Sequence, residues 1–263
     1  MPEFHNKTPF PAELIPLIDK QGSNVVAIII KGSYELDENR ELVPATEQVP
    51  LDFADERIGD PATGPIRVPA DIVYYKPFTD VLLARPKSDE DMKKLAGRKV
   101  SVEIGPVQFG GRTADPWPFG PVPSNAKPRL AFAGTYDKAW ADNRMPLLPE
   151  DFDERFNQVA PAKQISKGHL AGDEAFKLAN LYVDGDVIEG KLPGRTIIVS
   201  GNVLHNYFTE VAALDTVLVW CDKPIITLVW RHSIRPRQKV AEVCNVFACV
   251  ARLQATRELY GKP

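Results

Sequence analysis

The segment of residues 133–161, AGTYDKAWADNRMPLLPEDFDERFNQVAP, contains the residues whose types and spacing are best suited to chemistry. Glycosidase-like hydrolysis needs two carboxylates at a set separation, one of them with a raised pKa. One functional hypothesis is therefore a hydrolase that uses carboxylates of residues 137–154. The acids that could supply the pair are Asp137, Asp151, Asp153 and Glu154.

The same acids have structural roles that the local sequence explains. Pro149 followed by two acids predicts a helix start, where negative charge faces the positive end of the helix dipole. Asp151 and Arg155 stand four residues apart and could pair along that helix. Asp137 is placed to cap a short turn that carries Trp140. These roles favour structure over proton transfer, so no catalytic residue is assigned.

Other signatures of catalysis and metal binding are missing from the sequence. It has no phosphate-binding or dinucleotide-binding glycine loop, no H-E-x-x-H and no G-x-S-x-G. A metal triad of His169, His205 and an acid stays open, because ligands distant in sequence can meet in space. The three cysteines form no C-x-x-C pair, which favours free thiols. We expect neither a metal nor a cofactor.

Composition indicates a folded protein with a sizeable core. Of the 263 residues, 44% are hydrophobic and 25% are charged. The net charge of −3 gives no reason to expect a nucleic-acid partner. No apolar run approaches the length of a membrane span, and residues 1–10 lack the pattern of a signal peptide. The expected location is cytoplasmic, without membrane association.

The elements that would position these residues are mostly strands. A β-branched run at residues 25–30 and the alternating KVSVEIG at 99–105 are typical of strands. We expect a single domain over residues 1–263 that is mainly β, a β-sandwich or barrel-like fold with a few short helices and a C-terminal helix. Further strands are predicted at residues 41–43, twice within 70–86, and at 129–132, 196–199, 215–220 and 225–230.

The C-terminal helix is predicted from residues 239–253. Apolar residues recur there at intervals of three and four, which is typical of an amphipathic helix. We expect its apolar face to pack on the sheet, with a groove on a partner as the alternative. The apolar positions are Val240, Val243, Val246, Phe247, Val250 and Leu253.

Residues 105–128 form a loop rich in glycine and proline with aromatic residues between them. Long loops of this kind are often functional, and aromatic residues are favoured at the centres of binding surfaces. Its aromatic rings either fill the protein's own core or form a partner-binding lip. On the second interpretation, the candidate partner-binding residues are Arg112, Trp117 and Phe119, with Trp140 and Asp151 nearby.

Three stretches resemble the bacterial family called domain of unknown function 2169. They are NKTPFPAELIPLIDKQGSNVVAIIIKGSYEL near the start, GTYDKAW…PLLPEDFDERFNQVAPAKQ…LAGDE with KLPG in the middle, and LDTVLVWCDKPIITLVWR near the end. Many members carry a longer insert before a Phe-Gly-Gly motif, whereas only Phe109, Gly110 and Gly111 stand here. The resemblance covers most of the chain.

The resemblance implies a function in type VI secretion. It implies a non-enzymatic cytoplasmic adaptor or chaperone that binds a protein effector and helps to load it onto the spike, at the spike trimer or its PAAR tip. An adaptor requires a folded platform with exposed binding side chains, and it requires no nucleophile or metal. The hydrolase remains the alternative, and a self-associating assembly protein is a third hypothesis. The sequence leaves the oligomeric state open.

Overall fold

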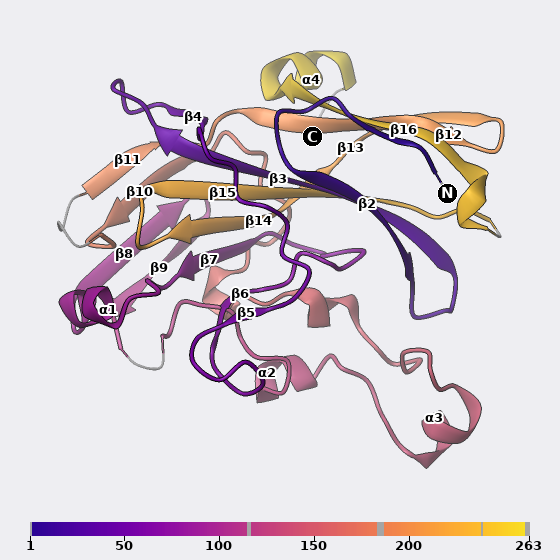
Figure 1. Ribbon diagram of the computed structural model, residues 1–263, viewed down its shortest axis with the longest axis horizontal. Coiled ribbons are helices and arrows are strands. Elements are labelled where there is room, and N and C mark those ends of the chain that lie inside the picture. Colours follow the sequence, from indigo (N-terminus) through magenta and orange to yellow (C-terminus); the bar gives the residue numbers. More distant parts are fainter. Residues whose placement is uncertain (1, 115–116, 183–186, 238, 261–263) are drawn as a thin grey trace.

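The computed structural model describes residues 2–114, 117–182, 187–237 and 239–260, and it is mainly β. Its strands form a central sheet, two four-stranded sheets and a two-stranded ladder (Figure 1). Every strand order begins and ends on an edge strand, so no sheet closes on itself within the described chain. The predicted mainly-β class is therefore confirmed, in the form of open sheets.

The central sheet is built around β3 (Asn24–Leu36), which is buried along nearly its whole length. Its Val and Ile residues suit this place because a strand covered on both faces needs apolar side chains at successive positions. β7 pairs in parallel with β14 and forms one edge of the sheet. The other members are β2 (Ala12–Ile18), β15 (Ile225–Ile234), β14 (Ala213–Trp220), β7 (Asp80–Ala84) and β4 (Leu42–Pro44).

The two four-stranded sheets share the main core with one face of the central sheet. Inward residues of β3, such as Ile28, pack in one cluster with Val102 and Val246 of the other sheets. The opposite face of β3 packs in a separate cluster with Tyr74. One sheet contains β1 (Phe4–Asn6), β16 (Val243–Arg252), β12 (Arg195–Val203) and β13 (Asn206–Val211), and the other contains β11 (Val187–Lys191), β10 (Ala175–Ala179), β8 (Lys99–Ile104) and β9 (Val107–Arg112).

The helices are short, and the described residues include none with the length and hydropathy of a membrane-spanning helix. A small ladder of β5 (Glu56–Arg57) and β6 (Ile66–Val68) lies outside the three larger sheets. The helices are α1 (Asp89–Leu95), α2 (Lys127–Leu130), α3 (Lys138–Asn143) and α4 (Leu253–Tyr260), and the 3-10 turns are η1 (Glu154–Asn157), η2 (Ala162–Gln164) and η3 (Val240–Glu242).

A C-terminal helix is present, but it is α4 and not residues 239–253, most of which form strand β16. The pairing of β16 with β12 shifts register near Asn245, whose φ is 46°. This irregularity inserts an extra residue, so Val243 and Val246 face the core although they are three apart. A bulged strand thus reproduced the spacing of a helix.

Two other predicted strands are also wrong. Residues 129–132 belong partly to α2, which begins with a lysine and a proline, and proline suits the first turn of a helix. Within residues 70–86 only β7 is a strand. The preceding loop is held by side chains instead, because Arg231 donates to the backbone oxygens of Asp71 and Val73, at 2.8 Å each.

Candidate functional site

The outer edge of β7 is covered by two distant segments, around residues 117–122 and 158–166. The amide of Leu83 donates to the backbone oxygen of Phe119 at 3.2 Å, and the indole of Trp117 donates to the Leu83 oxygen at 3.0 Å. The Gln164 side chain donates to the Val81 oxygen at 2.8 Å. The strand's unpaired backbone groups are thereby satisfied without a further strand.

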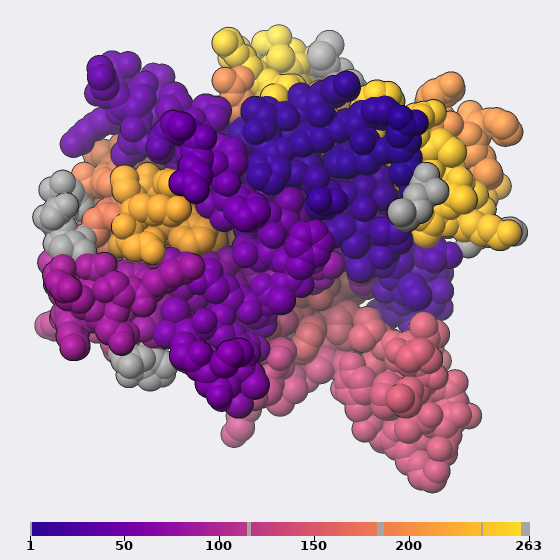
Figure 2. Space-filling model, in the orientation of Figure 1, coloured from indigo at the N-terminus to yellow at the C-terminus, as the bar shows by residue number. Residues whose placement is uncertain are grey.

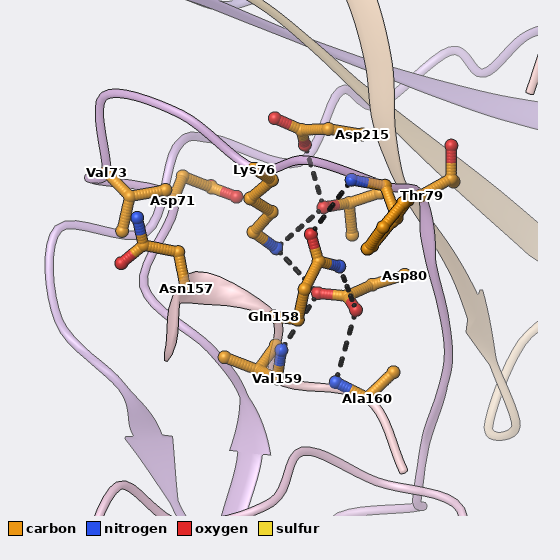
Figure 3. Close-up of polar contacts among 12 residues, drawn as sticks. Asp71, Val73, Lys76, Thr79, Asp80, Asn157, Gln158, Val159, Ala160 and Asp215 are labelled. Carbon is orange, nitrogen blue, oxygen red and sulfur yellow. Dashed lines mark hydrogen bonds and ion pairs between the residues drawn. The ribbon is translucent and has the colours of Figure 1, made fainter. Parts of the chain in front are cut away.

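Asp80, fully buried at the start of β7, fixes the second of these segments (Figure 3). Its carboxylate accepts hydrogen bonds from the Gln158 side chain at 2.7 Å and from the amides of Val159 and Ala160 at 3.0 and 3.3 Å. It also pairs with the buried ammonium of Lys76 at 2.9 Å. A buried charge with this many partners holds its neighbours in one geometry.

Further buried charges lie on the same face of the central sheet, and all of them are paired. Arg231 bonds Asp215 at 2.5 Å. Lys31 lies between the carboxylates of Asp52 and Asp71, at 2.5 and 2.9 Å. Burial raises the pKa of Asp52, although Lys31 opposes this. Lys31 thus attaches the loop that precedes β7 to the sheet, whereas the pair of Arg231 and Asp215 joins β15 to β14.

An open cavity of about 640 Å³ lies beside the segment that Asp80 fixes. This volume falls in the range of ligand-binding pockets. Its walls are mostly apolar, and its floor includes Gln158 and Ala160. The remaining lining residues are Phe78, Val122, Pro128, Arg129, Phe132, Arg155, Pro161, Ala162, Ile165, Ser166 and Lys167.

Two arginines lie over aromatic rings at the cavity wall. The guanidinium of Arg129 lies 4.5 Å from the centre of the Phe156 ring, and that of Arg155 lies 4.4 Å from the centre of the Phe132 ring. Arg129 also donates to the backbone oxygens of Phe156 and Val122. Burial lowers the pKa of Arg129. The wall therefore combines apolar surface with fixed positive charge.

An arm of residues 133–152, which carries α3, projects from the body (Figure 2). Its two ends meet, because the amide of Asp153 donates to the Phe132 oxygen at 3.0 Å. Within the arm, Trp140 packs edge-on against Tyr136 and donates from its indole to the Leu147 oxygen at 2.9 Å. Phe132 and Arg155 flank the two ends of the arm and line the cavity, so the base of the arm borders it.

A comparison with protein families gives one match. The model described as "Uncharacterized protein conserved in bacteria (DUF2169)" matches residues 21–112 and 106–231, which include the cavity and the arm. The chain belongs to this family. No curated protein and no solved structure matches the chain significantly.

The acids of the arm in this DUF2169 protein each have a local partner. Asp137 accepts from the Trp140 amide at 2.8 Å, so its predicted capping function is confirmed. Asp151 accepts from the amide and hydroxyl of Thr135, at 2.9 and 2.7 Å. Arg155 pairs with Asp153 at 2.6 Å, and not with Asp151 as predicted.

The pKa shifts of Asp151 and Asp153 run against general-acid chemistry. Hydrogen bonds from Thr135 lower the pKa of Asp151, and those from Arg155 lower the pKa of Asp153. A general acid needs the opposite shift. The predicted helix start at residue 149 is also absent, since the 3-10 turn η1 begins at Glu154 after Asp153. The geometry thus gives no support to a carboxylate pair that moves protons.

Histidines are likewise kept apart or engaged in packing. His169 bonds the backbone oxygen of Lys76 at 2.9 Å, and the His232 ring stacks on Phe208. His205 lies in the turn between β12 and β13. Among the described residues, no three His, Cys, Asp or Glu side chains are grouped to hold a metal ion.

The five candidate binding residues fall in two separate places, and none lines the cavity. Arg112 is exposed at the end of β9, where it bonds the Gly97 oxygen at 2.9 Å. Trp117 is half-buried, and Phe119 is buried in the main core. That burial supports the interpretation of the loop as core, at least for Phe119.

Trp140 and Asp151 lie on the arm, away from β9 (Figure 1). Contact of any of the five with a partner stays a prediction. Sequence reasoning missed the cavity residues Arg129 and Phe132, because it assigned them to a strand. The signal that could have found them is the alternation of arginine and phenylalanine at positions 129, 132, 155 and 156.

Proposed function

We propose that this protein is a non-enzymatic adaptor that binds a type VI secretion effector and a spike component, and that the cavity holds part of one of them. The resemblance in sequence suggests the class of partner. The geometry supports a binding function, because the buried charges serve to fix walls and loops. The adaptor would cover an apolar surface of its client until the client docks on the spike.

The observation that carries this proposal is the cavity itself. Its apolar lining lies outside the protein's own core clusters for the most part, and the Asp80 network holds its floor in place. A partner that covers this open apolar surface removes it from water, and this burial favours binding. A floor fixed before binding also reduces the entropy that binding costs.

The test fills the cavity and measures partner capture. Ala162 lines the cavity and is exposed, so Ala162→Trp should occupy the space without disturbing the core. The tagged protein is purified from cells that express the neighbouring genes, and bound proteins are identified by mass spectrometry. We expect the wild type to retain an effector or spike protein and Ala162→Trp to lose most of it.

The matched control is Ala255→Trp, an exposed alanine on α4 at the opposite side of the molecule (Figure 1). It should capture the partner as the wild type does, and both variants should keep the wild-type melting temperature. The proposal fails if the wild type retains neither class of partner. It also fails if both tryptophan variants capture equally well.

A further inference from the structure

The charged residues that line the cavity are all positive. They are Arg129, Arg155 and Lys167, and no aspartate or glutamate lines it. An occupant with positive charge would be repelled, whereas one with a carboxylate would meet complementary charge. A cation that has no negative partner within the protein is the one that is free to pair with such an occupant.

Arg155 is already neutralised. Its guanidinium meets the carboxylate of Asp153 through Nη2 at 2.6 Å and through Nε at 3.0 Å. Lys167, in contrast, is exposed at the rim of the cavity and makes no ion pair with any described residue. The rim therefore has a free positive charge, but an exposed lysine alone gives little specificity.

Arg129 differs from both Arg155 and Lys167, because it is partly buried and yet has no carboxylate partner among the described residues. It is half-buried, and its bonds go to the backbone oxygens of Phe156 at 2.8 and 3.1 Å and of Val122 at 3.0 Å. No described carboxylate forms an ion pair with it. Asp55 and Asp80 act on it only through longer-range attraction.

A guanidinium has five N–H groups, and these bonds use three of them. Two N–H groups of a partly desolvated cation therefore remain, on a wall of an apolar cavity. A carboxylate is the group that such a cation binds best.

We propose that the cavity takes a short segment of the partner protein in which apolar side chains flank a carboxylate, and that this carboxylate bonds Arg129, with Lys167 adding attraction at the rim. This rests on the proposed adaptor function and specifies its client. A neutral apolar segment is the competing occupant.

The experiment measures binding of three labelled peptides by fluorescence anisotropy. They share flanking leucines and differ at one central position, which is glutamate, glutamine or lysine. Wild-type protein should bind the glutamate peptide about tenfold more tightly than the glutamine peptide, and the lysine peptide least. Arg129→Gln should remove the preference for glutamate over glutamine.

A double-mutant cycle separates this pair from general effects. The cycle pairs the glutamate-to-glutamine change in the peptide with Arg129→Gln, and its coupling reports the direct contact. Arg155→Gln is the matched comparison on the same wall, and its coupling should be smaller because Asp153 already neutralises that arginine. Lys167→Glu changes an exposed side chain and should weaken binding of the glutamate peptide, so it tests the proposal even if Arg129→Gln does not fold.

Equal binding of the glutamate and glutamine peptides, or failure of all three to bind, would overturn the inference. So would a coupling at Arg155 as large as that at Arg129. The adaptor function fails separately, through loss of partner capture by the wild type. If Ala162→Trp abolishes partner capture but the peptides show no preference for glutamate, the adaptor function is retained and the proposal of an acidic segment is rejected.

Discussion

Phe119 shows how a loop residue can belong to the core. Its ring lies 5.9 Å from that of Phe109 and 5.5 Å from that of Trp117, and its backbone oxygen accepts from Leu83 on β7. Glycine and proline in the surrounding loop favour an irregular course, which lets the ring turn inward. The aromatic residues of this loop therefore close the edge of the central sheet.

We expect Phe119→Ala to lower the free energy of unfolding by about 3–5 kcal/mol, because it opens a cavity in packed core. Arg112→Ala, at an exposed position at the end of β9, should change the free energy of unfolding by less than about 0.5 kcal/mol. Urea unfolding followed by circular dichroism measures both. Equal, small effects would mean that the loop does not pack as described.

His232 should make stability depend on pH. Burial lowers its pKa, so the folded protein releases the proton more readily than the unfolded chain does. Between the lowered pKa and the ordinary value of about 6.5, the unfolded chain binds more protons, and stability must fall as pH falls through this window. His232→Phe keeps a ring on Phe208 and removes the titration.

The measurement is urea unfolding at pH 7.5, 6.5 and 5.5. The wild type should lose more stability toward pH 5.5 than His232→Phe does, and the difference should vanish above pH 7.5. Parallel pH profiles for the two proteins would contradict the assignment, because other acids and histidines are common to both.

At the scale of elements, Asp80 joins β7 to the floor of the cavity. The acid lies on a strand, whereas Gln158, Val159 and Ala160 belong to an irregular segment with little regular structure of its own. In a helix or sheet the backbone amides of this segment would donate to backbone oxygens. Here they donate to the Asp80 carboxylate instead, which keeps the segment in position.

Asp80→Ala should lower the free energy of unfolding by about 3–5 kcal/mol, since Lys76 would remain buried without its charge partner. The double variant Lys76→Met with Asp80→Asn should recover much of the loss. Asp89→Ala, at an exposed position on α1, is the control. Amide hydrogen exchange should show faster exchange at residues 158–160 in Asp80→Ala, and unchanged exchange there would refute the fixing function.

Elements that depend on local pattern were predictable, and those that depend on partners were not. The β-branched runs at residues 25–30, 215–220 and 225–230 lie in strands as predicted, because burial on a sheet selects those side chains. Strand β16 was mistaken for a helix because a bulge near Asn245 changed the spacing of its apolar residues. Spacing alone does not distinguish a bulged strand from a helix turn.

In the whole molecule, the arm is a long projecting loop whose two ends lie next to each other. The bond between Asp153 and Phe132 closes its base, and only a few contacts, such as that of Lys20 with the Phe152 oxygen at 2.8 Å, join it to the hairpin of β2 and β3. Most of its residues are exposed, so the body gains little stability from it.

Replacement of residues 134–150 by two glycines should therefore change the free energy of unfolding by less than about 1 kcal/mol, since closing a shorter loop costs little. Partner capture should fall, because the arm borders the cavity. Calorimetry and the affinity purification described above measure the two effects. A shortened protein that unfolds would show that the arm belongs to the folding unit.

The mainly-β class and the cap formed by Asp137 are predictable from local sequence, because each follows from neighbouring residues and short-range periodicity. The cavity, its cationic wall and the covered edge of β7 become visible only in the folded chain. These features depend on residues that are far apart in the chain. Asp80 and Gln158 are separated by 78 residues, and Gln164 and Val81 by 83. Contacts of that range leave no local pattern, since they are set by how the sheets and loops pack together.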